Sequence, residues 1–154
     1  MTTRRIGSII GFQNEPSIYV IVKRNCIYIG ETQRLPVSRW GEHLCNFGTF
    51  SKKLYEYNDE LAESNKFALY FFAYRCQELL EHFQAKDLIK RNTQYIEDLL
   101  HRKFVSHNIC TKFTLISDTE KTAPIRSNTD QAEIIAESIF EAILEDLKIH
   151  LLKS

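Results

Sequence analysis

The first part of the chain carries the alternating and β-branched pattern of two adjacent strands. Residues 17–23 and 26–30 are rich in Ile, Val and Tyr, and only Arg24-Asn25 separates them. Two residues is the length of the commonest hairpin loop, and Asn tolerates the positive φ that such a loop requires, although the usual Asn-Gly pair is absent. The pattern therefore predicts a β-hairpin.

Helices and one further strand are expected after the hairpin. Residues 35–44 have a short helical pattern with Pro36 in the first turn, where the missing N–H costs little. A second helix is expected near 51–62. The run from Lys66 to Tyr74 is almost continuously apolar, which is typical of a central strand covered on both faces.

The second half of the chain is mainly helical by pattern. Residues 77–104 predict a helix in two pieces, with Asn92-Thr93 capping the second piece, and a short strand is expected at 112–116. After a loop over 118–128, Asp130-x-x-Glu133 is a capping pattern that begins a last helix running to about residue 152. The fold class predicted is α+β, or a mixed α/β domain of three layers.

Length and composition narrow the class of protein. A chain of 154 residues points to one domain over 1–154, and 44% apolar with 26% charged residues is typical of a soluble globular protein. No apolar run approaches the length of a membrane helix, and the N-terminal segment lacks a convincing signal peptide, so we expect no membrane partner and a cytoplasmic location. The four cysteines lie far apart and predict reduced thiols.

Charge is distributed unevenly although the total is zero. Residues 1–112 contain 16 Lys and Arg against 12 Asp and Glu, whereas residues 113–154 contain 4 against 8. A mildly basic body with an acidic C-terminal segment is compatible with nucleic acid on one face, but does not require it.

The predicted hairpin brings chemically useful side chains together. With a two-residue loop, Tyr19 pairs with Gly30 and Ile21 with Tyr28, so the two tyrosines share one face as diagonal neighbours about 7–8 Å apart at Cα. A three-residue loop would separate them. Arg39 and His43 lie one turn apart on the following helix. A guanidinium to bind phosphate, an imidazole for proton transfer and phenols to orient water predict a site for an anionic substrate.

These positions resemble a known signature. Ser17-Ile-Tyr19, Tyr28-Ile-Gly30 and Arg39-x-x-x-His43 look like the motifs of the GIY-YIG nucleases, over roughly residues 17–108. The resemblance implies a GIY-YIG-like small central β-sheet, made of the hairpin plus a further strand, flanked by helices. Residues 113–154 would then be a C-terminal extension with an extra acidic helix.

The same resemblance implies a metal-dependent endonuclease that hydrolyses DNA phosphodiester bonds, of the stand-alone restriction or phage type. Its active site would consist of Tyr19, Tyr28, Arg39, His43 and a Glu on a later helix, for which Glu97 fits best. Glu97 would hold one Mg²⁺ or Mn²⁺ ion, and Asn108 would give support. Arg39 and the metal would lower the pKa of Tyr19, which would activate or orient water.

Departures from the signature leave alternatives open. Ser17 replaces the first Gly, only eight residues separate Tyr19 from Tyr28, and the Pro usual before the Asn is missing. Asp98, Glu78 and Glu81 remain alternative metal ligands. The alternative function is a non-catalytic module of the same fold that binds nucleic acid or protein.

Target selection and assembly are predicted only in outline. The segment 44–66, an N-terminal arm with Arg4 and Arg5, or a second subunit would select the DNA target. The apolar face of the last helix is expected to dock on the domain itself, with dimerisation as the alternative, so the protein would be a monomer or a homodimer. This face consists of Ile135, Ile139, Ile143 and Leu147.

Overall fold

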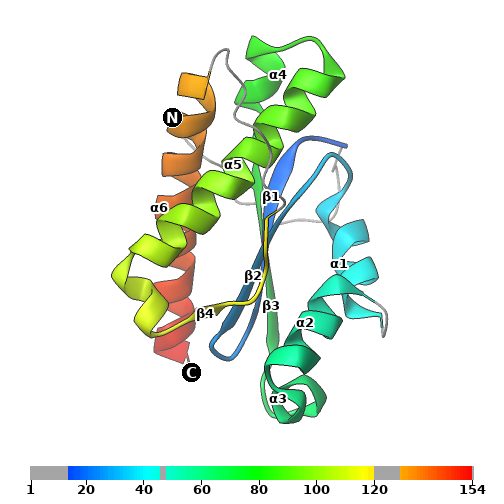
Figure 1. Ribbon diagram of the computed structural model, residues 1–154, viewed down its shortest axis with the longest axis vertical. Coiled ribbons are helices and arrows are strands. Elements are labelled where there is room, and N and C mark those ends of the chain that lie inside the picture. The colour runs from blue at the N-terminus through cyan, green and yellow to red at the C-terminus, as the bar shows by residue number, and fades with distance from the viewer. Residues whose placement is uncertain (1–13, 46–47, 120–128, 154) are drawn as a thin grey trace.

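A four-stranded sheet lies at the centre of the computed structural model, which describes residues 14–45, 48–119 and 129–153 (Figure 1). The strands lie in the order β3-β1-β2-β4; β2 and β4 are parallel, and the other neighbours are antiparallel. Helices cover both faces of the sheet. The predicted α+β class, with a small sheet flanked by helices, is confirmed.

The hairpin has the predicted register. β1 (Ser17–Lys23) and β2 (Cys26–Thr32) are joined by a two-residue loop, and Lys23 pairs with Cys26. Arg24 in this loop has φ of 53°, in the left-handed region that non-Gly residues rarely adopt. Because side chains alternate across a strand, this register places Tyr19 and Tyr28 on the same face.

The apolar run over Lys66–Tyr74 forms an edge strand, so the prediction of a central strand is wrong. β3 (Leu69–Arg75) pairs with β1 alone, and the centre of the sheet is β1 itself, which is buried along its whole length. Phe72 packs on one face of the sheet and Ala73 on the other. The continuous apolar pattern therefore reports that both faces are covered, and says nothing about position in the sheet.

Three short helices cover the face that carries the tyrosines. They are α1 (Pro36–Leu44), α2 (Thr49–Tyr57) and α3 (Asp59–Glu63). The single helix expected near 51–62 is divided at Asn58, whose side chain accepts a hydrogen bond from the Leu61 N–H at 2.8 Å and caps α3. Phe50 and Leu54 of α2 pack against this face of the hairpin.

The opposite face is covered by the long helices. These are α5 (Lys86–Ser106) and α6 (Thr129–Lys153). Between β3 and α6 the chain also forms α4 (Glu78–His82), the 3₁₀ helix η1 (Asn108–Thr111) and the strand β4 (Thr114–Leu115). The predicted face of α6, Ile135, Ile139, Ile143 and Leu147, is buried in the same core as α5 and the sheet. The expectation that this face docks on the domain is confirmed.

The predicted break at Asn92-Thr93 is wrong, because both residues lie inside α5 and the chain breaks at 83–85. Both side chains are fully buried and donate hydrogen bonds at 2.8 Å to main-chain carbonyls four residues earlier, those of Leu88 and Ile89. Such bonds satisfy a polar side chain within a helix, so the same residue types that cap a helix are tolerated here.

Several expectations concern thiols, membranes and the terminal segments. All four cysteines have free thiols, two of them buried. None of the helices in 14–45, 48–119 and 129–153 is long and apolar enough to cross a bilayer. Arg4 and Arg5 lie outside the described residues, as does most of the loop expected over 118–128.

A buried hydrogen bond ties β3 to α6 and gives a test of the fold. The Tyr74 hydroxyl donates to Asp146 at 2.8 Å, and both residues are buried. We expect Tyr74→Phe to lower the free energy of unfolding by about 1–3 kcal/mol, because a buried charged acceptor loses a donor. Urea denaturation measures the change. The control Tyr55→Phe alters an exposed residue and should change stability little; equal losses in both variants would contradict the assignment.

Candidate active site

A polar cavity of about 280 Å³ lies between the hairpin, α1 and α5. Its wall contains four of the five predicted catalytic residues and three others, namely Tyr19, Tyr28, Glu31, Arg39, Gln94, Glu97 and Asp118. The four predicted residues come from β1, β2, α1 and α5, so segments nearly 80 residues apart in sequence contribute to one cavity. This convergence makes the cavity the candidate active site.

The hairpin places the two phenols in register. The Tyr19 and Tyr28 rings are stacked, with centroids 6.3 Å apart and planes inclined by 16°. The Tyr19 ring extends over Gly30, its partner across the strands, so that any Cβ at position 30 would overlap the phenol oxygen. Gly30 is therefore required by this close approach.

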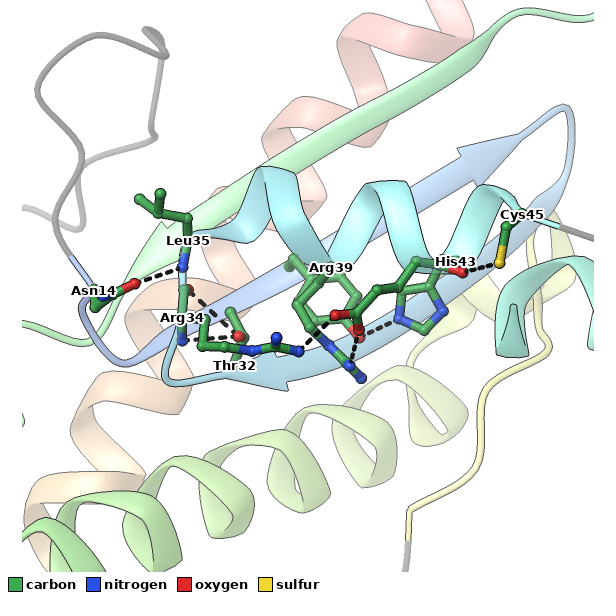
Figure 2. Close-up of polar contacts among 9 residues, drawn as sticks. Asn14, Thr32, Arg34, Leu35, Arg39, His43 and Cys45 are labelled. Carbon is green, nitrogen blue, oxygen red and sulfur yellow. Dashed lines mark hydrogen bonds and ion pairs between the residues drawn. The ribbon is translucent and has the colours of Figure 1, made fainter. Parts of the chain in front are cut away.

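The turn before α1 sets the direction of that helix. The Thr32 hydroxyl accepts a hydrogen bond from the Arg34 N–H at 3.0 Å, and Asn14 accepts one from the Leu35 N–H at 3.3 Å. Figure 2 shows these contacts and shows Arg39 and His43 projecting from one side of α1 toward the strands. Pro36 occupies the first helical position, as predicted.

His43 lies behind the tyrosines, and not on the cavity wall as expected. It is 2% exposed, and its ring contacts both Tyr19 and Tyr28, with centroids 5.4 and 4.9 Å away. Its Nδ1 accepts a hydrogen bond from the Phe50 N–H at 3.2 Å, so the neutral ring carries its proton on Nε2 and donates it to the Tyr19 hydroxyl oxygen at 2.5 Å. Burial, and then the charge of Arg39, lower the pKa of His43 to about 4.

Burial also controls the acidity of the phenols. Burial raises the pKa of Tyr19 well above its usual value and the pKa of Tyr28 to about 12. The neighbouring Tyr28 phenol raises the pKa of Tyr19 further. Arg39 hydrogen-bonds Tyr19 and acts in the opposite direction, as expected, but its effect is smaller than that of burial. In the protein alone, both phenols therefore keep their protons at neutral pH.

Arg39 already has an anionic partner. Glu42, one turn further along α1, forms ion pairs with Arg39 and with Arg34, the latter at 2.7 Å. Glu42 is about half exposed and Arg39 about one third exposed, so water and solutes reach this pair. A phosphate can thus compete with Glu42 for the guanidinium, because carboxylate and phosphate accept the same two-pronged hydrogen bonds.

Three carboxylates, those of Glu31, Glu97 and Asp118, also line the cavity. Glu97 faces it from α5, with Gln94 one turn earlier on the same side, and Glu31 and Asp118 complete the wall. No group of three or more His, Cys, Asp or Glu side chains in the described part of the chain is clustered closely enough to hold a metal. Oxygen donors suit a hard divalent cation, so the donor set fits an ion held by Glu97, with water and substrate completing its coordination.

The alternative carboxylates lie elsewhere. Asp98 is buried on the other side of α5, where it pairs with Arg102 at 2.6 Å and accepts a hydrogen bond from Thr119 at 3.2 Å. Glu78 and Glu81 belong to α4 and do not line the cavity. Asn108 is exposed at the start of η1 and does not line it either.

Three wall residues were not predicted from the sequence. Gln94 lies three residues before Glu97, so helical spacing alone could have identified it once Glu97 was chosen. Glu31 directly follows Gly30, and β2 extends to Thr32, two residues beyond the predicted strand. Asp118 has no comparable signal, because it lies in irregular chain after β4.

The contact between Tyr19 and Gly30 predicts opposite effects for two similar substitutions. Gly30→Ala should lower the free energy of unfolding by about 1–3 kcal/mol, because the added methyl group displaces a buried ring. Gly41→Ala is the control. Gly41 lies inside α1 with open space around it, so alanine should raise stability by up to about 1 kcal/mol. Urea denaturation of both variants measures the signs, and stabilisation by Gly30→Ala would show that the ring lies elsewhere.

The buried imidazole predicts a dependence of stability on pH. The pKa of His43 falls from 6.5 to about 4 on folding, so within this window the unfolded chain binds a proton that the folded protein does not. Stability should therefore fall as the pH is lowered from 6.5 toward 4, with at most about 1.4 kcal/mol per pH unit from this residue. His43→Gln should flatten the slope.

The measurement is the free energy of unfolding from pH 7 to pH 5 for the unmodified protein, His43→Gln and His82→Gln. His82 is exposed on α4, so its substitution should leave the slope unchanged. An unchanged slope in His43→Gln would mean that the imidazole takes up its proton in the folded protein as easily as in the unfolded chain.

Comparison with known proteins does not identify a family. The chain matches no protein-family model, no curated protein and no solved structure. What the cavity can do is therefore argued from its own residues and from the motif pattern of the sequence.

Proposed function

We propose that this chain is a metal-dependent endonuclease of the GIY-YIG type, which hydrolyses phosphodiester bonds in DNA. One observation carries the proposal: Tyr19, Tyr28, Arg39 and Glu97 line a single cavity. The hairpin, α1 and α5 contribute these residues in the order that the motif resemblance implies. Two phenols, a guanidinium and a carboxylate are the groups needed to bind a phosphate, orient water and hold a cation.

The proposed substrate contact begins with Arg39. Its guanidinium is partly exposed at the cavity and is paired with Glu42, so a scissile phosphate would displace or share that carboxylate. The fixed positive charge then lies beside the phosphoryl oxygens, where negative charge develops during hydrolysis. Arg34, which pairs with the same Glu42, keeps that carboxylate near α1 after the exchange.

Tyr19 is proposed to orient the attacking water. Its oxygen accepts hydrogen bonds from His43 Nε2 and Arg39, and its own proton is directed to Tyr28, so the two phenols would orient a water in the cavity together. Because burial raises the pKa of Tyr19, orientation is the favoured assignment over proton removal in the protein alone. His43 is a positioning residue, which holds the phenol from behind.

Glu97 is proposed to hold one Mg²⁺ or Mn²⁺ ion, and Glu31 and Asp118 line the same cavity. Such an ion supplies Lewis acidity to a phosphoryl oxygen. The surrounding residues keep their own tasks: Arg39 binds phosphate, the phenols orient water, and Gln94 offers an amide to the substrate.

DNA is the proposed partner, the protein acts as a monomer or homodimer, and the cytoplasm is its proposed location.

One observation favours a second candidate, a non-catalytic nucleic-acid-binding module of the same fold. Arg39, the arginine of the cavity wall, already pairs with Glu42, and both phenols keep their protons at neutral pH. In such a module the cavity would bind phosphate without hydrolysing it. An activity measurement separates the two candidates directly.

The test of catalysis is Glu97→Gln, which keeps the side-chain shape and removes the charge that a hard cation requires. We expect the nicking rate of plasmid DNA in Mg²⁺ to fall at least about a hundredfold, since a metal contributes several kcal/mol to the transition state. DNA affinity at one stated salt concentration should remain or rise slightly, because an anion near the phosphate disappears.

Asp98→Asn is the matched control on the same helix. Asp98 points to the other side of α5, so this variant should lose some stability through Arg102 and keep its nicking rate. Full activity in Glu97→Gln with loss in Asp98→Asn would move the metal ligand to Asp98. DNA binding without nicking in the unmodified protein, with Mg²⁺ and with Mn²⁺, would support the binding module.

A further inference from the structure

A second cavity, of about 540 Å³, lies at the loop end of the hairpin, where the start of β3, the segment after η1 and the end of α6 meet. We call it the loop-end cavity. Tyr70 and Phe113 of its wall pack with the core that faces α5 and α6, whereas Tyr28 belongs to the core on the other face. The loop-end cavity shares no wall residue with the candidate active site, and the proposed nuclease reaction does not use it.

The loop-end cavity is strongly basic. Arg24, Lys66 and Lys112 line it, and none of its described wall residues is Asp or Glu. Within the described part of the chain, none of these three cations takes part in an ion pair. Three like charges around one hollow repel one another, and an anionic group such as phosphate relieves that repulsion.

Aromatic rings form the floor of the same cavity. The Tyr70 ring meets the His150 ring edge to face, with centroids 4.3 Å apart, and Phe113 lies 6.2 Å from His150. The Arg24 guanidinium lies over the Phe67 ring, 4.9 Å from its centroid. A wall that combines flat apolar rings with cations suits a ligand that carries both a flat ring and a negative charge.

His150 is a fixed part of the cavity wall. It is 6% exposed, and its Nε2 donates to the main-chain oxygen of Arg24 at 3.3 Å. The neutral ring therefore has its lone pair on Nδ1, and no described residue hydrogen-bonds this buried atom. The imidazole is therefore held in place by the Arg24 carbonyl and by the rings around it, and it contributes a flat surface to the wall.

The conformation of Arg24 is unfavourable for its own residue type. Its φ of 53° is tolerated best by Gly or Asn, so the hairpin loop gives no reason for arginine at this position. Such outliers occur most often where a side chain serves binding. Here the strained residue directs a cation to the mouth of the cavity.

We infer that the loop-end cavity binds a nucleoside monophosphate. Arg24, Lys66 and Lys112 receive the phosphate, and the base lies among the aromatic rings of Phe67, Tyr70 and Phe113. The volume lies within the ordinary range of about 300–1,000 Å³ for small-ligand sites. This inference does not depend on the proposed nuclease activity, because no residue of the candidate active site lines this cavity.

The test is titration of the ¹⁵N-labelled full chain with AMP and GMP, followed by NMR and by calorimetry. Saturable shifts should concentrate at the amides of Asn25, Ala68 and Phe113, which line the loop-end cavity, with a Kd below about 1 mM. Adenosine alone and inorganic phosphate alone should each bind at least about tenfold more weakly than AMP, because each makes only part of the contacts that AMP makes.

Two variants separate binding from folding. Arg24→Gly removes the cation while suiting the positive φ, so it should maintain or raise stability and weaken AMP binding about tenfold. Lys112→Gln should weaken binding similarly. Lys90→Gln removes an exposed charge on α5, outside the cavity, and should leave the affinity unchanged.

Several results would overturn the inference. Equal affinity for inorganic phosphate and AMP would show a bare anion site, and shifts confined to Tyr28 and Glu97 would place the nucleotide in the other cavity. Unchanged affinity in both Arg24→Gly and Lys112→Gln would remove the cations from binding. If a short single-stranded oligonucleotide binds saturably but AMP and GMP do not bind, the cavity is part of a strand-binding surface instead.

Discussion

The buried hydrogen bond between His43 and Tyr19 is the interaction on which the candidate site depends. The Phe50 N–H occupies Nδ1 of the imidazole, which leaves Nε2 to donate to the phenol oxygen. Three elements, β1, α1 and α2, are thereby joined through the His43 imidazole, and Gly30 leaves the space into which the Tyr19 ring extends. With the proton on Nδ1 instead, Tyr19 would have to donate its proton to His43, and the proton would no longer be directed to Tyr28.

Burial and charge compete at this site, and burial has the larger effect. It lowers the pKa of His43 and raises the pKa of both tyrosines, although Arg39 lies close enough to oppose the shift at Tyr19. Arg39 in turn shares Glu42 with Arg34, so its charge is partly neutralised until another anion arrives. The imidazole and the two phenols are therefore held in fixed positions and uncharged at neutral pH, and a bound phosphate or cation would change the electrostatics of the site most.

The alternation of side chains along the hairpin gives this small domain two different faces. One face carries the tyrosines, which line the candidate active site together with Arg39 of α1 and with Gln94 and Glu97 of α5. The other packs against α5 and α6, and its loop end opens into the basic, aromatic cavity. A carboxylate wall suits a cation, whereas a wall with three cations suits an anion, so the two cavities favour different ligands although one hairpin contributes to both.

The sequence by itself determined the features that depend on neighbours along the chain. The hairpin register follows from a two-residue loop, α1 from Pro36 and its helical spacing, and α6 from its apolar stripe, although the helix begins at Thr129 and Asp130 lies within its first turn. That register alone places Tyr19 and Tyr28 on the same face of the hairpin. Only the tertiary structure decided that β3 lies at the edge, that α5 runs unbroken through Asn92, and that His43 stands behind the phenols. It alone placed Asp118 on the cavity wall. These outcomes depend on which surfaces meet at long range, and local periodicity reports that a residue is buried without reporting what buries it.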